Sequence, residues 1–127
     1  MSFEIHTEGS CTGEGGRWSY RVDYRNDESM VETINSDAGE TTGTTGVQMK
    51  LMAILKALAF ARSIVADESI TIKSDCLFCI KCITKEFDCI SDDAFRRDKV
   101  TRGFVQYLQE IWWNMGGLHV RFEYGPA

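Results

Sequence analysis

The sequence lacks any apolar run that approaches the about 20 residues a helix needs to cross a bilayer. Its first residues, "MSFEIHTEG", also lack the basic and apolar regions of a signal peptide. These two absences argue against a membrane protein or a secreted protein. We therefore expect a soluble protein that resides in the cytoplasm and has no membrane partner.

Basic residues are scarce, with 14 Lys and Arg against 19 Asp and Glu, a net charge of −5. Such a chain exerts no global attraction on nucleic acid, so any nucleic-acid contact must come from a local basic patch. The basic residues near position 97 do not make one, because Asp92, Asp93 and Asp98 are interspersed among them. We interpret that segment as a solvated charged surface.

The cysteines are few and odd in number: there are five. An odd count without a secretion signal predicts reduced thiols and no disulfide framework. Cys76, Cys79 and Cys82 are spaced like some metal ligands. On a helix, however, three residues turn the chain by about 300°, so the three side chains fan around the axis and do not converge. Small, buried helix residues are the expected role.

The residues that are present suffice for one buried core, since 43% of the chain is hydrophobic. We expect a single domain over residues 1–127. Alternating apolar and polar residues predict strands, and apolar residues spaced by three and four predict helices. The expected elements are strands at 3–8, 17–25, 30–37, 69–75 and 118–124, a helix at 47–66, a Cys-rich helix after Asp75, and a helix through Phe104 and Met115.

This order, β-β-β-α-β-α-α-β, predicts an α/β domain on a mixed sheet with an antiparallel hairpin. The threonines and glycines of "GETTGTTG" (39–46) precede the first long helix and include good capping residues. A right-handed strand–helix–strand crossover then leads to the strand that ends near Asp75.

Three motifs in this order resemble the ribonuclease H family. They are "TEGSC" (7–11) at the end of the first strand, "TTGVQMKLMA" (44–53) at the start of the first helix, and "IKSDC" (72–76) at the end of the fourth strand. The resemblance covers nearly the whole chain and implies an RNase H-like fold with a five-stranded mixed sheet. It also implies a metal-dependent nuclease site in which Mg²⁺ or Mn²⁺ ions bind between carboxylates and the scissile phosphate.

The family's acids fall on this sequence unevenly. The acids of the first and fourth strands correspond to Glu8 and Asp75, which are the candidate catalytic residues and, at most, weak metal ligands. Lys50 stands where the family has its helix acid, and no position here matches the fourth acid. Since an ammonium repels divalent cations and offers no lone pair, metal-dependent hydrolysis is expected to fail. Lys50 either forms an ion pair with the two acids or extends into solvent.

The resemblance also implies positions that contact an RNA/DNA hybrid: Gly9, Ser10, Cys11, Thr45, Gly46 and Val47. Ser10 and Thr45 keep hydroxyls that can meet phosphates. Gly46 and Val47 replace two family asparagines, so groove recognition is weakened.

Three functions follow from this resemblance. The first is a catalytically impaired domain, hence not an enzyme, that binds nucleic acid or a protein and needs no cofactor. The second is a divergent ribonuclease H that cleaves RNA/DNA hybrids through Glu8 and Asp75, with its missing acids supplied by a partner chain or by nearby acids such as Glu14. A homodimer is a separate partner arrangement that the sequence leaves open. The third is a protein-binding decoy or inhibitor that uses exposed aromatics such as Trp18 or Trp113.

Overall fold

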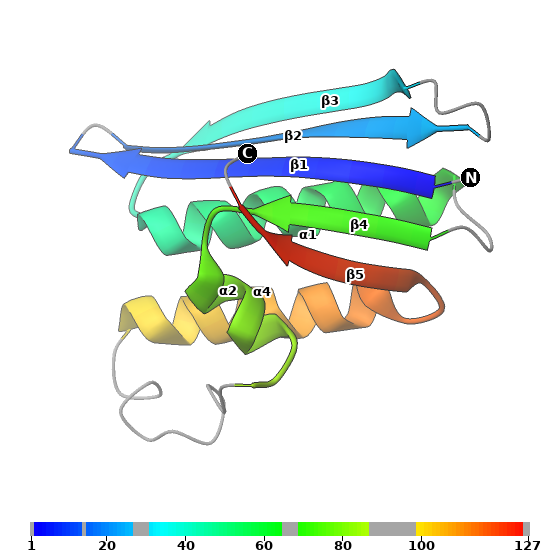
Figure 1. Ribbon diagram of the computed structural model, residues 1–127. Helices are drawn as coiled ribbons and strands as arrows, with labels where there is room; N and C mark the ends of the chain where they lie inside the picture. Colours follow the sequence, from blue (N-terminus) through cyan, green and yellow to red (C-terminus); the bar gives the residue numbers. More distant parts are fainter. Residues whose placement is uncertain (1, 14, 27–30, 65–68, 87–98, 126–127) are drawn as a thin grey trace.

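The computed structural model describes residues 2–13, 15–26, 31–64, 69–86 and 99–125, which form one sheet and three helices (Figure 1). The elements are β1 (Ser2–Thr12), β2 (Gly15–Arg25), β3 (Val31–Thr41), α1 (Gly46–Ile64), β4 (Ser69–Ser74), α2 (Leu77–Ile83), α4 (Lys99–Met115) and β5 (His119–Tyr124). None of the helices in these ranges is long and apolar enough to cross a membrane.

The sheet has the strand order β3-β2-β1-β4-β5. The first three strands form an antiparallel meander, whereas β4 pairs parallel to β1 and β5 pairs parallel to β4. The predicted mixed five-stranded sheet is therefore confirmed. The α1 crossover carries the chain from the edge strand β3 across β2 and β1 to β4, which places the ends of β1 and β4 side by side.

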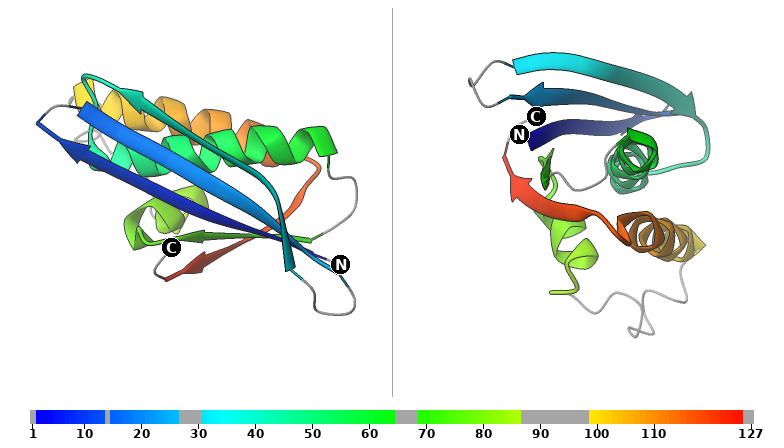
Figure 2. Two further views of the ribbon diagram at one scale, coloured as in Figure 1. Left: turned by 90° about the horizontal axis from the view of Figure 1, so that it is seen from above. Right: turned by 90° about the vertical axis from the view of Figure 1, so that its right-hand side faces the viewer.

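The two long helices cover one face of this sheet, as both views in Figure 2 show. Residues of β1 alternate accordingly: Phe3 and Ile5 are buried toward the helices, and Glu4 points to the other face. Leu51 and Leu58 of α1 are fully buried in the same core. The helix begins after Thr45, whose Oγ1 accepts the Gln48 N–H at 3.2 Å, an N-cap that satisfies one of the free amides of the first turn.

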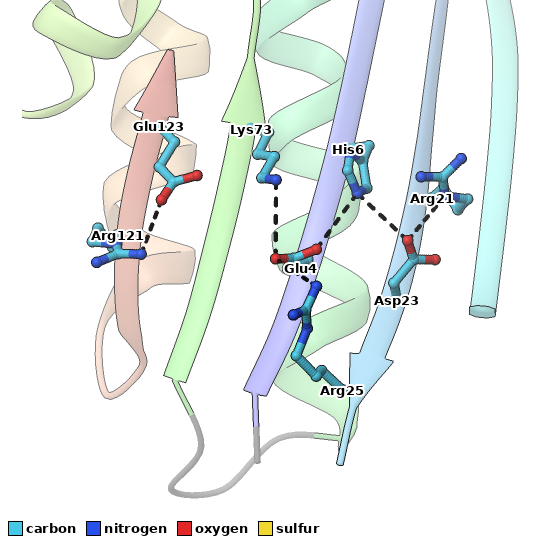
Figure 3. Close-up of polar contacts among 8 residues, drawn as sticks. All are labelled: Glu4, His6, Arg21, Asp23, Arg25, Lys73, Arg121 and Glu123. Carbon is cyan, nitrogen blue, oxygen red and sulfur yellow. Dashed lines mark hydrogen bonds and ion pairs between the residues drawn. The ribbon is translucent and has the colours of Figure 1, made fainter. Parts of the chain in front are cut away.

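The opposite face of the sheet carries charged side chains that pair across strands (Figure 3). Asp23 is 6% exposed and accepts a hydrogen bond from Thr33 at 2.8 Å, and Arg21 and His6 lie within 3.4 Å of its carboxylate. Burial is the main reason that the pKa of His6 is lowered, and Arg21 lowers it further. His6 therefore has a structural role in this network.

Some expected boundaries and roles were wrong. β3 extends to Thr41, into the stretch expected to precede the helix, because Gly39 packs against Trp18: a Cβ at Gly39 would lie 2.5 Å from its ring. Trp18 is partly buried against the core, so it is not an exposed binding residue.

Cys82 is disulfide-bonded, contrary to the expectation of wholly reduced thiols. The interspersed acids and bases at 91–98 lie outside the described residues.

Candidate nucleic-acid interface and metal site

The candidate site lies where β1 and β4 end at one edge of the sheet. Their parallel pairing runs up to His6 opposite Lys73. Glu8 and Asp75 each lie two residues farther along the chain, Glu8 within β1 and Asp75 directly after β4, so the two acids lie at the same end of neighbouring strands. They also line one shallow groove together. The structure thus brings together the two carboxylates that the resemblance picks out.

The first turns of α1 pack directly on β1 at Gly9. A Cβ at this position would lie 2.3 Å from the Lys50 nitrogen and 2.4 Å from the Met49 carbonyl carbon. Any side chain would push the helix away, because real Cβ atoms do not approach backbone atoms so closely. Gly9 therefore fixes the distance between the strand that carries Glu8 and the helix that carries Lys50.

Lys50 forms an ion pair with Asp75. Its Nζ donates to Asp75 Oδ1 at 2.7 Å, and the two side chains are 23% and 44% exposed. Lys50 thus does not extend freely into solvent. Glu8 behaves differently: it is exposed and, among the described residues, forms no ion pair within 4 Å. The cluster therefore consists of one ion pair and one unpaired carboxylate.

These residues do not fit a divalent metal. A Mg²⁺ or Mn²⁺ site needs several oxygen ligands in near-octahedral arrangement. Here one carboxylate accepts from an ammonium, and within the described ranges no three His, Cys, Asp or Glu side chains gather as metal ligands would. Glu14, the acid considered as a replacement, lies outside the described residues.

The candidate hybrid-binding residues gather around the start of α1. Pairing of β1 with β4 stops before Gly9, Ser10 and Cys11, so this end of β1 meets the helix start instead. A Cβ on Gly46 would lie 4.0 Å from the Cys11 nitrogen, and Cys11 Sγ donates to the Thr44 carbonyl at 3.3 Å. The structure thus places this set together. Val47 is the exception, because its side chain packs against the core and does not face a bound nucleic acid.

The groove also contains a pair that the sequence did not reveal. Arg17 Nε lies 3.0 Å from Glu40 Oε1, and the two residues are opposite each other on β2 and β3. Both line the groove beside Ser10. Only the strand register brings them together, so a sequence-level signal would have required the exact length of β3.

Cys76 and Cys79 are the second feature that sequence reasoning missed. Cys76 caps the N-terminus of α2, and the hydrogen bond from Cys79 lowers the pKa of Cys76 to about 6, against an opposing effect of burial. The pKa of Cys79 is raised, mainly by the same hydrogen bond and secondly by burial. The Cys-x-x-Cys spacing was visible in the sequence, but it was interpreted as a metal pattern or as small, buried helix residues.

The fold matches that of known proteins. A family model described as RNase H matches residues 1–123. The N-terminal RNase H domain of a Mycobacterium tuberculosis protein is similar over 100% of this chain and 88% of that chain, with a TM-score of 0.75 and 9% identity. RNase H1 from Halobacterium salinarum is similar over 99% and 86%, with a TM-score of 0.73 and 13% identity.

A third solved structure, LC9-RNase H1, is described as a type 1 RNase H with the type 2 active-site motif. It is similar over 98% of this chain and 62% of that chain, with a TM-score of 0.79 and 14% identity. None of the curated proteins compared matches the chain. Because the family model covers all but the last residues, the chain belongs to the RNase H family.

Proposed function

We propose that this domain binds an RNA/DNA hybrid without hydrolysing it. RNase H proteins bind such hybrids and generally use divalent metals. The observation that carries the proposal is the 2.7 Å contact from Lys50 Nζ to Asp75 Oδ1. The position that carries an acid in the family carries Lys50 here. Its ammonium pairs with Asp75, which is one of the two remaining carboxylates.

The lysine offers Asp75 part of the charge that metals supply in the family. A salt bridge at this distance is a charge-assisted hydrogen bond, and a metal would have to displace it and then tolerate the ammonium nearby. Of the two acids Glu8 and Asp75, only Glu8 is then free to bind a metal. A single carboxylate is a weak site for a hard cation such as Mg²⁺.

Binding is supported by the start of α1. The first turn of a helix presents free backbone amides and the positive end of the helix dipole, which favour phosphate. Ser10 and Cys11 lie beside it, and Thr45 caps it. The acids of the groove oppose this attraction, although Glu40 and Asp75 are each paired with a cation. We therefore expect weak, salt-sensitive binding through the nucleic-acid backbone.

The test measures binding and cleavage of one substrate in parallel. A fluorescently labelled RNA/DNA hybrid should show saturable binding at low salt that weakens as salt rises, and no RNA cleavage above background in Mg²⁺ or Mn²⁺. Ser10→Glu should weaken binding, because it adds negative charge beside the helix start. Ser36→Glu is the matched control, since Ser36 is an exposed β3 residue that does not line the groove.

Two other outcomes would point elsewhere. Metal-dependent cleavage abolished by Asp75→Asn would favour a divergent ribonuclease H. Absence of hybrid binding would favour a protein-binding module, for which the 73% exposed Trp113 is the described aromatic most open to a partner.

A further inference from the structure

Cys76 and Cys79 form a sulfur pair at the start of α2, one residue beyond the Lys50–Asp75 ion pair. Both thiols are free. The Cys79 backbone N–H donates to Cys76 Sγ at 3.4 Å, so the Cys76 side chain folds back over the first helical turn toward Cys79. This orientation arises because Cys76 has extended backbone angles, φ −112° and ψ 95°, and serves as the N-cap.

The two thiols differ in access to solvent. Cys76 is partly exposed, whereas Cys79 is fully buried and its Sγ lies 3.9 Å from the Val47 carbonyl oxygen. A reagent in solution can therefore reach Cys76 and not Cys79. An accessible first thiol with a second thiol beside it suits thiol–disulfide exchange, because the second sulfur can attack the mixed disulfide that forms on the first.

We propose that Cys76 and Cys79 are a thiol–disulfide exchange site that accepts disulfides of small thiols. The Cys76 thiolate attacks one sulfur of the small disulfide, forming a mixed disulfide and releasing one small thiolate, which takes up a proton. Cys79 then loses its proton and attacks Cys76 Sγ. The Cys76–Cys79 bond forms, the second small thiol leaves, and the two cysteines have been oxidised by two electrons that reduce the small disulfide.

Digestion with trypsin isolates these two cysteines in one peptide, whose mass reports their oxidation state. Cleavage after Lys73 and Lys81 releases the peptide Ser74–Lys81, which contains these two cysteines and no other. The full chain is incubated with oxidised glutathione and quenched with N-ethylmaleimide in denaturant, so that buried Cys79 is also alkylated if it is still a thiol. The protein is then digested and examined by mass spectrometry. Exposed Cys11 is the matched control within the same chain, since the structure shows it free and accessible.

We expect the Ser74–Lys81 peptide to lose both alkylation sites and to become two hydrogens lighter, while Cys11 retains glutathione. In Cys79→Ser, closure should be lost and glutathione should remain on Cys76. In Cys76→Ser, no adduct should form on buried Cys79. A parent peptide that stays doubly alkylated while Cys11 reacts, or that holds glutathione on Cys76 without closing, would overturn the proposal. The parent measurement needs no variant to fold.

Discussion

The Lys50–Asp75 contact predicts a specific energetic coupling within the remodelled site. Lys50→Met removes the ammonium but keeps an unbranched side chain of similar length, so packing against β1 is retained. Asp75→Asn removes the partner's charge at nearly constant size. If the 2.7 Å contact stabilises the fold, the two substitutions together should cost less than the sum of each alone.

The exposure of the pair sets the magnitude. Lys50 is 23% exposed and Asp75 44% exposed, so solvent screens the pair more than a buried one and less than a surface one. Surface pairs contribute about 0.2–1 kcal/mol, and hydrogen bonds to charged groups about 1.5–3 kcal/mol. We expect a coupling of about 1 kcal/mol, which should decrease as salt is raised because exposed charges are screened.

Urea unfolding of the parent, both single variants and the double variant provides the coupling energy. Glu8→Gln in a second cycle with Lys50→Met is the matched control, because Glu8 lies in the same groove without an ion pair to Lys50. That second coupling should be near zero. A coupling to Glu8 as large as that to Asp75, or no coupling to Asp75 at low salt, would refute the assignment of this ion pair.

Two further substitutions test the surrounding frame. Gly9→Ala should destabilise the protein by about 2–3 kcal/mol because the new Cβ meets the α1 backbone, whereas Gly13→Ala, with open space around it, should change the melting temperature little. His6 should make stability depend on pH: since burial lowers the pKa of His6 in the folded state, its contribution is complete above about pH 6.5 and is lost as pH falls below that value. Urea unfolding at neutral and mildly acidic pH should therefore show a smaller acid loss for His6→Gln than for the parent; equal losses would contradict this.

Much of the fold was predictable because strands and helices leave periodic patterns. Buried Ile5 and Leu51 belong to alternating and helical patterns that tertiary packing then satisfied. The end of β3 was not predictable, since its Gly and Thr residues have no strand pattern and are ordered by pairing with β2. Tertiary contact overrode local preference there.

The site was predictable to the level of elements but not of contacts. The motifs placed Glu8 on β1, Lys50 in the first turns of α1 and Asp75 directly after β4, because the first and third motifs mark strand ends and the second marks a helix start. Which acid Lys50 contacts depends on side-chain geometry that no spacing encodes. The Cys76 and Cys79 pair was visible in sequence, but its orientation depends on the extended backbone of Cys76 at the helix cap.

The most direct test of the central claim is a calorimetric titration with Mn²⁺, in which the heat of metal binding is measured for the parent and for Lys50→Glu. The account predicts no saturable Mn²⁺ binding at this site by the parent. Lys50→Glu should gain binding, because it replaces the cation with a third carboxylate beside Glu8 and Asp75. Saturable Mn²⁺ binding by the parent that Asp75→Asn abolishes would contradict the claim that Lys50 excludes the metal.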